Sequence, residues 1–235
     1  MSAASTPTTT VLNVRESRPR QFDLLVFDWD GTLMDSAAAI SNSLRLACAD
    51  MRYPVPSEAD AKFIIGLGLN DALARVLPDV PPSDYPALLE RYRYHFLRRD
   101  GDTTLFDGVP ETLRDLKDAG FQLAVATGKS RRGLERAFDV LDIKPLFDAT
   151  RCADEARTKP HPAMLLWLLD ELNVPAGRTL MIGDTSHDME MAQAAGVPRL
   201  GVTYGAHPLE NLTQYDPVAC VHTIAELKAW LLSHA

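Results

Sequence analysis

The stretch LLVFDWDGTLMDS, residues 24–36, decides the fold, and it begins with a short uninterrupted run of apolar residues. Such a run is typical of a strand that is buried on both faces of a parallel sheet. Asp28 and Asp30 follow the run with a single residue between them. Residues i and i+2 of an extended chain point to the same side, so the two carboxylates lie together while Trp29 points away. Gly31 then allows the chain to turn sharply.

After residue 104, short apolar segments alternate with helical segments. This alternation predicts a parallel sheet with helices on both faces. Strands are expected over residues 24–28, 121–127, 147–152, 179–184, 199–205 and 218–222. Helices are expected between them, over residues 110–119, 130–141, 161–173, 186–195 and 224–233.

The segment between the first strand and the rest of the sheet contains no good strand. Proline and glycine divide it into expected helices over residues 36–51, 57–65, 70–77 and 83–99. The predicted fold class is therefore α/β, a Rossmann-like parallel-sheet core with helices on both faces and an inserted α-helical cap. The expected division is a flexible tail over residues 1–20, a core over 21–35 and 105–235, and a cap over 36–104.

Composition limits the classes of partner. The chain has 235 residues, 46% hydrophobic and 24% charged, so it can bury a sizeable core. Its formal net charge of −8 argues against sequence-independent binding to nucleic acid, which needs basic surface. No apolar run approaches the roughly 18 residues of a membrane span, and the N-terminus lacks the apolar region of a signal peptide. Three widely spaced cysteines predict free thiols in a reducing cytoplasm. Monomer and homodimer both stay open.

Polar residues follow several of the expected strands. Ligands of open parallel sheets bind at the carboxyl ends of the strands, so residues that are distant in sequence are expected to meet there. The expected set contains carboxylates, one hydroxyl and one lysine: Asp28, Asp30, Asp184, Asp188, Thr127 and Lys159.

This set of groups predicts a specific chemistry. Converging carboxylates repel one another and raise each other's pKa, a penalty that a divalent cation removes. Oxygen ligands favour a hard cation such as Mg²⁺. The lysine, the hydroxyl and the backbone N–H groups after the second strand can bind a dianion. A metal and a cationic nest that face a carboxylate are what phosphoryl transfer needs.

The spacing of Asp28 and Asp30 fits the same chemistry. One carboxylate can attack phosphorus and form an aspartyl-phosphate. The other can protonate the leaving-group oxygen and later deprotonate the water that hydrolyses the intermediate.

These residues resemble the motifs of a known family. The segment Asp28–Leu33 is similar to the DxDGT[LV] signature of the haloacid dehalogenase superfamily, which is highly specific. Thr127, Lys159 and the Gly183-Asp184-x-x-x-Asp188 segment resemble its second, third and fourth motifs, which are weak alone and strong together. The resemblance covers about residue 22 to the end. The helical insertion resembles the cap of the subgroup that contains phosphoglycolate phosphatase and β-phosphoglucomutase.

The resemblance implies a role for each matching residue. Asp28 would be the nucleophile and a Mg²⁺ ligand, and Asp30 the general acid/base whose backbone carbonyl also meets the metal. Lys159 would hold the nucleophile and the phosphate. Asp184 would bind Mg²⁺, and Asp188 would support it directly or through another ligand.

Two further segments carry implied roles. Thr127 and the Gly128 amide would bind the transferring phosphoryl group, although Thr127 could also cap a helix. The sequence Gly66-Leu67-Gly68 resembles the cap loop that closes over the leaving group.

The function expected from all this is a Mg²⁺-dependent phosphatase of a small phosphorylated metabolite, most like phosphoglycolate phosphatase. Alternatives are a β-phosphoglucomutase-like phosphomutase, or a phosphatase of another sugar phosphate, a nucleotide or pyrophosphate. Asp30 argues against a dehalogenase, which lacks it, and Lys62 is the only cap lysine that could serve a phosphonatase. A catalytically silent binding protein would be expected to have lost Asp28 or Asp30, and both are present.

Some neighbours of the motifs are expected to have ordinary roles. His161 and His187 flank motif residues and are expected to be neutral surface or rim residues. Asp35 is expected to cap the first cap helix together with Ser36.

Overall fold

The computed structural model describes residues 20–98 and 103–235 of the chain. The predicted tail, residues 1–20, therefore lies outside the described residues except for Arg20. No helix within the two described ranges is long and apolar enough to cross a lipid bilayer.

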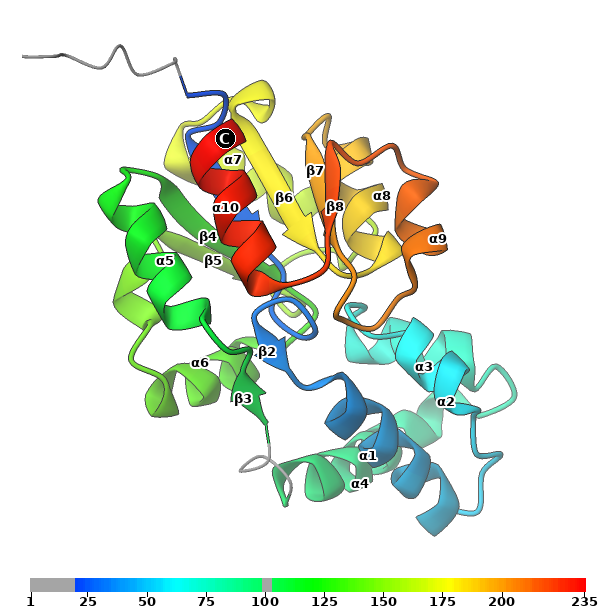
Figure 1. Cartoon of the computed structure of the whole chain (residues 1–235). Coiled ribbons are helices and arrows are strands. Elements are labelled where there is room, and N and C mark those ends of the chain that lie inside the picture. Colours follow the sequence, from blue (N-terminus) through cyan, green and yellow to red (C-terminus); the bar gives the residue numbers. More distant parts are fainter. Residues whose placement is uncertain (1–19, 99–102) are drawn as a thin grey trace, which may run out of the picture.

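The described core is built on one parallel sheet (Figure 1). Its strand order is β5-β4-β1-β6-β7-β8, and every neighbouring pair is parallel. This arrangement confirms the predicted α/β fold. The strands are β1 (Leu24–Phe27), β4 (Gln122–Thr127), β5 (Ala149–Cys152), β6 (Thr179–Gly183), β7 (Arg199–Val202) and β8 (Ala219–Val221).

Strand β1 lies inside the sheet, and all four of its residues are fully buried, as the apolar run predicts. Leu25 and Phe27 pack into one hydrophobic cluster, and Leu24 and Val26 into a second, because side chains alternate across a strand. The chain continues from β1 to β4 on one side and later to β6 on the other. The switch point of the topology, where ligands of such sheets bind, is therefore next to the end of β1.

Helices cover both faces of the sheet (Figure 1). Helices α5 (Val109–Asp118), α6 (Arg131–Val140) and α10 (Ile224–His234) contribute to the cluster that contains Phe27. Helices α7 (Ala163–Leu172) and α8 (Ser186–Ala194) contribute to the cluster that contains Val26. Shorter helical segments are α9 (Leu209–Thr213), η1 (Pro82–Asp84), η3 (Lys144–Leu146) and η4 (Ala176–Arg178).

The insertion between β1 and β4 is helical, with a hydrophobic core of its own. It contains α1 (Ala37–Asp50), α2 (Glu58–Phe63), α3 (Leu69–Val76) and α4 (Tyr85–Leu97). Two short strands, β2 (Met34–Asp35) and β3 (Thr104–Leu105), pair antiparallel where the chain enters and leaves it (Figure 1). We call residues 36–104 the cap, and its exact limits stay a prediction.

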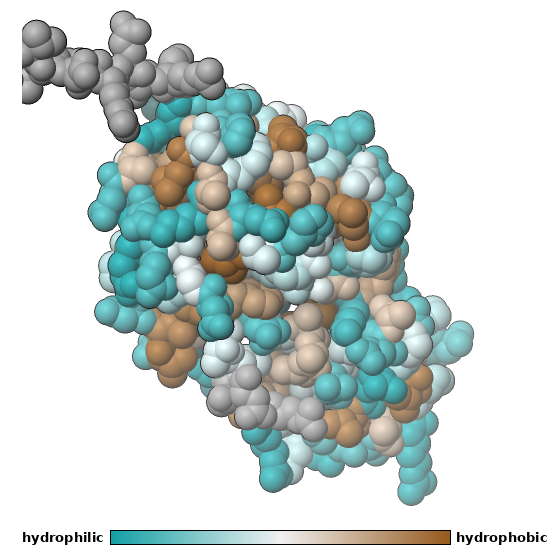
Figure 2. Space-filling view, in the orientation of Figure 1, coloured by the Kyte–Doolittle hydropathy of each residue, from teal (hydrophilic) through white to brown (hydrophobic). Residues whose placement is uncertain are grey.

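Differences from the expected elements are confined to short or terminal segments. Strands β2 and β3 and helix α9 were not expected, because segments of two to five residues have no readable periodicity. Strand β7 ends at Val202 rather than at residue 205, and the residues after Val202 form bends outside the sheet. The face shown in Figure 2 is mostly hydrophilic, with hydrophobic residues scattered over it.

Candidate active site

The carboxyl end of β1 presents Asp28, which is fully buried. Lys159 Nζ lies 2.6 Å from Asp28 Oδ1 and 2.6 Å from Asp188 Oδ1, and the lysine is buried as well. These are contacts between charges without hydrogen-bond geometry, and Asp28 Oδ2 has no hydrogen-bond partner. Burial raises the pKa of Asp28 well above its ordinary value, although Lys159 opposes the shift. Burial lowers the pKa of Lys159, but Asp188 and Asp28 outweigh it and raise that pKa overall.

Asp184 and Asp188 are fixed by hydrogen bonds from residues on three different segments. Asp184 Oδ1 accepts from Thr32 Oγ1 at 2.8 Å, and Oδ2 accepts from the Ala206 backbone N–H at 2.7 Å. Asp188 Oδ2 accepts from the backbone N–H and the hydroxyl of Thr185 at 3.0 and 2.6 Å. The Asp188 backbone N–H donates back to Thr185 Oγ1, which completes a capping box at the start of α8. The other oxygen, Oδ1, is left for Lys159.

Three of these carboxylates can converge on a cation. Asp28, Asp184 and Asp188 each offer an oxygen atom, and these atoms all lie within 4.8 Å of one another. Burial and then the Asp188 charge raise the pKa of Asp184 to about 7, against the hydrogen bonds from Ala206 and Thr32 and the charge of Lys159, which lower it. Buried oxygen donors, one of them unpartnered on Asp28, fit a hard divalent cation.

Gly31 is required by the close packing around this cluster. Its φ is +87°, and a Cβ there would lie 2.2 Å from Asp184 Oδ2. The predicted turn after Asp30 therefore needs glycine for two reasons, the left-handed backbone and the approach of a carboxylate.

Asp30 is buried, and its Oδ1 accepts from Ser36 Oγ at 2.6 Å and lies 2.8 Å from Lys129 Nζ. The predicted capping role of Ser36 and Asp35 is wrong. Helix α1 begins after Ser36 without a side-chain cap bond, because the backbone of Ser36 (φ −123°, ψ −6°) is not in the extended conformation typical of a capping residue. The Ser36 hydroxyl donates to Asp30, and Asp35 lies exposed in β2. Sequence reasoning missed both partners of Asp30, and the position of Lys129 directly after the second motif was the available signal.

Thr127 ends β4 fully buried, and its Oγ1 accepts from the Lys129 backbone N–H at 3.1 Å. The alternative role of Thr127 as a helix cap is wrong, because Ser130 caps α6 and accepts from the Gly133 N–H. The Thr127 hydroxyl is not used as a helix cap, and its proton can still be donated to a ligand.

The cap reaches the core at Gly128. A Cβ on Gly128 would lie 2.5 Å from the Gly66 carbonyl oxygen and 2.7 Å from that of Leu67. A Cβ on Gly68 would lie 2.5 Å from Thr158 Cγ2. The structure thus brings the predicted cap loop against the predicted phosphate-binding residue, and only glycine permits so close an approach.

The two histidines differ from each other. His161 lies half-buried, and its Nδ1 accepts from the Ala163 N–H at the start of α7. The expectation that His187 lies at the surface or rim is wrong, because it is buried between the core and the cap. Its expected neutral form agrees with burial, which lowers its pKa to about 4.

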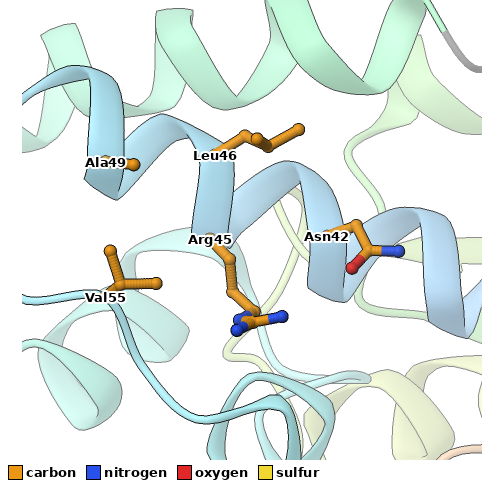
Figure 3. Close-up of a pocket in the computed structure, with 5 residues that line it drawn as sticks. All are labelled: Asn42, Arg45, Leu46, Ala49 and Val55. Atoms are coloured by element: carbon orange, nitrogen blue, oxygen red, sulfur yellow. The ribbon is translucent and has the colours of Figure 1, made fainter.

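Two open hollows lie elsewhere on the described surface. One has a volume of about 350 Å³ and is lined by α1 and the segment after it (Figure 3): Asn42, Arg45, Leu46, Ala49 and Val55. The other, of about 510 Å³, lies between α2 and residues 206–211. Neither is lined by a residue of the predicted site, so the buried carboxylate cluster is the better guide to chemistry.

Known proteins resemble this chain over most of its length. The family model described as "Haloacid dehalogenase-like hydrolase" matches residues 25–202. "Probable phosphatase IndB" of Dickeya dadantii is 34% identical over 210 residues, covering 87% of this chain and 91% of that protein. A phosphoglycolate phosphatase of Colwellia psychrerythraea is 31% identical over 220 residues, covering 87% and 95%.

Solved structures show the same similarity. The crystal structure of "a predicted phosphatase" from Clostridium acetobutylicum has a TM-score of 0.79 at 25% identity, and the match covers 90% of this chain and 98% of that one. A hydrolase from Pseudomonas syringae has a TM-score of 0.82 at 20% identity, covering 91% and 98%, which shows the fold alone.

Proposed function

The chain belongs to the haloacid dehalogenase-like hydrolases as a phosphatase, and from that premise we propose that it is a Mg²⁺-dependent enzyme that forms an aspartyl-phosphate intermediate. The proposed substrate is a small phosphorylated metabolite, and phosphoglycolate is the first to test because several relatives carry its name. The predicted cytoplasmic location is part of this proposal.

One observation carries the proposal: the unpartnered, buried Asp28 Oδ2 beside Lys159. Lys159 contacts the other oxygen of Asp28 and favours the anion against the opposing effect of burial, and Oδ2 stays available as the nucleophile. Burial without a hydrogen bond is costly, so an oxygen kept in this state points to a functional role.

The proposed reaction has two displacements. Asp28 Oδ2 forms a bond to phosphorus while the bond from phosphorus to the leaving-group oxygen breaks, and Asp30 gives that oxygen a proton. Asp30 then takes a proton from water, whose oxygen attacks phosphorus, and inorganic phosphate leaves as Asp28 is restored. Ser36 and Lys129 hold Oδ1 of Asp30, which leaves Oδ2 for the proton transfers.

The residues around Asp28 would bind the phosphoryl group and the cation. Asp28, Asp184 and Asp188 would hold Mg²⁺ together with the Asp30 carbonyl that the family resemblance implies. The cation would neutralise charge on the phosphoryl oxygens. The Thr127 hydroxyl and the Gly128 N–H would bind the same oxygens from the β4 side.

The alternative activities make different demands. A phosphonatase needs a cap lysine at the substrate, whereas Lys62 pairs with Glu58 at 2.6 Å on α2. A silent binding protein would not need Asp28 beside the buried Lys159 and Asp30 beside Lys129. A phosphomutase would use the same groups but return the phosphoryl group to a sugar phosphate instead of releasing inorganic phosphate.

The test measures release of inorganic phosphate from p-nitrophenyl phosphate and then from a panel of phosphorylated metabolites, ranked by kcat/KM. Asp28→Asn removes the nucleophile, and Asp35→Asn is the matched control, because Asp35 is an exposed aspartate of the same stretch. We expect the first variant to be inactive and the second to match the wild type. Undiminished turnover by Asp28→Asn would refute the assignment of Asp28 as the nucleophile. Equal turnover with and without excess chelator would refute the requirement for a metal ion.

A further inference from the structure

The carbonyl of Phe63, the last residue of α2, accepts from two histidines of the core. His187 Nε2 lies 2.8 Å from this oxygen, and His207 Nε2 lies 3.0 Å from it. His187 is in the first turn of α8, His207 is in the segment after β7, and both are buried. The last carbonyls of a helix have no partner within the helix, so the core supplies what α2 lacks.

The hydrogen positions on both rings follow from their partners. The Ser186 backbone N–H points to His207 Nδ1 at 3.1 Å, so Nδ1 carries a lone pair and the proton of the neutral ring is on Nε2. A carbonyl oxygen can only accept, so His187 Nε2 must carry a proton too. Both rings therefore donate to the Phe63 oxygen. A proton on His207 Nδ1 would point at the Ser186 N–H, so the hydrogen bond from Ser186 favours the neutral ring.

The side chain of Phe63 packs against the same two rings. It stacks on His207 with centroids 4.7 Å apart and planes 8° apart, and it meets the edge of His187 at 5.5 Å. The Arg75 guanidinium of α3 lies 4.7 Å from the Phe63 ring centroid. Phe63 therefore joins the cap to the core through both hydrogen bonds to its carbonyl and aromatic contacts of its ring.

The position of this unit links the cap to the catalytic centre. Three residues after Phe63, the chain enters the loop whose carbonyls meet Gly128. On the core side, His187 precedes Asp188, and His207 follows Ala206, whose N–H holds Asp184. The segments that fix the carboxylates therefore also hold the cap loop.

We propose that His187 and His207 are positioning residues that clasp the Phe63 carbonyl and hold residues 64–68 over the phosphate site. The clasp, meaning these two histidines and that carbonyl, sets the fraction of molecules with a closed cap. Its effect on substrate binding rests on the function proposed above. A weaker clasp lowers the fraction of the binding-competent form and raises KM in proportion, while kcat changes little once substrate closes the cap.

The test compares asparagine and glutamine at the same position. The amide nitrogen of His187→Gln can occupy the place of Nε2 and donate to Phe63, whereas His187→Asn is too short to reach it. His207→Asn can still accept from the Ser186 N–H but loses both the bond to the Phe63 carbonyl and the stacking on the Phe63 ring. His222→Asn is the control, because His222 is exposed and its side chain contacts the Thr203 hydroxyl.

Two readouts separate the clasp from a general structural role. Hydrogen exchange of the backbone amides of residues 64–68 is expected to be about fivefold faster in His187→Asn and in His207→Asn than in the wild type. The factor corresponds to the loss of about one net hydrogen bond. KM for the best phosphomonoester is expected to rise by up to about fivefold, and by less the larger the closed fraction of the wild type, with kcat within about twofold of the wild type. His187→Gln and His222→Asn should match the wild type in both.

Unchanged exchange in His187→Asn and His207→Asn overturns the clasp, and if one variant fails to fold the other decides. Equal defects in His187→Gln and His187→Asn also overturn it, because the hydrogen bond would then not be the cause. Faster exchange with unchanged KM overturns its link to substrate. Absence of any wild-type phosphatase activity refutes the proposed function instead, and the exchange measurement still decides the clasp.

Discussion

Replacement of Lys159 by methionine is expected to destabilise the metal-free protein strongly. Lys159 is fully buried, and its ammonium group is 2.6 Å from Asp28 and from Asp188. Removing one partner of a buried ion pair costs about 3–5 kcal/mol, because the remaining charges stay buried without compensation. For a chain of this size each kcal/mol lowers the melting temperature by about 2–4 °C. The expected fall is therefore about 6–20 °C.

The assay is thermal unfolding in excess chelator, followed by circular dichroism, with the same measurement in Mg²⁺. Mg²⁺ should reduce the difference between variant and wild type, because a bound cation neutralises the same carboxylates. Lys144→Met is the matched control: Lys144 pairs with Glu135 at the surface, and such a pair contributes about 0–1 kcal/mol.

A second substitution tests the cause. In the Lys159→Met background, Asp188→Asn removes one of the uncompensated charges and should restore part of the lost stability, which a double-mutant cycle measures. If, in excess chelator, Lys159→Met lowers the melting temperature no more than Lys144→Met does, the buried ion pair does not stabilise the protein to the expected extent.

Three further perturbations test the site. Because burial raises the pKa of Asp184 to about 7, its metal-free contribution to stability is full below about pH 4 and is lost as the pH rises through 7. Mg²⁺ should accordingly raise the melting temperature more at pH 8 than at pH 5, and an equal rise at both would contradict this. Gly128→Ala should raise KM about tenfold, because its Cβ overlaps the cap loop at a cost of about 1–3 kcal/mol. Gly177→Ala, with no atom within 4 Å of its Cβ, should not. Ser36→Ala removes a hydrogen bond to the Asp30 carboxylate and should lower kcat about tenfold with KM unchanged; a normal kcat would count against Asp30 as acid/base.

The core of the fold could be predicted because its signals are local. The run before Asp28 predicted β1, and the alternation after residue 104 predicted the parallel sheet. The rule that ligands gather at carboxyl strand ends then predicted that Asp28, Lys159, Asp184 and Asp188 would meet, as they do.

The errors concern contacts between segments that are distant in sequence. The burial of His187 depends on where the cap lies, and no periodicity in α8 encodes that position. Ser36 looked like a helix cap because serine favours that position, but its backbone lacks the extended conformation of a cap, and its hydroxyl donates to the carboxylate of Asp30. Lys129 was likewise placed beside Asp30 only by the fold.

The pairing of β2 with β3 has a consequence for how the molecule can change over evolutionary time. Met34 pairs with Leu105 and Asp35 with Thr104, so the inserted segment starts and finishes at neighbouring points about 5 Å apart. Lengthening an insert between such ends costs only about 0.6 kcal/mol of loop-closure entropy for each doubling of its length. The core carboxylates can therefore stay constant while the inserted helices are lengthened, shortened or exchanged. The β2–β3 pair therefore joins a core that carries the carboxylates to an insert that can vary independently of it.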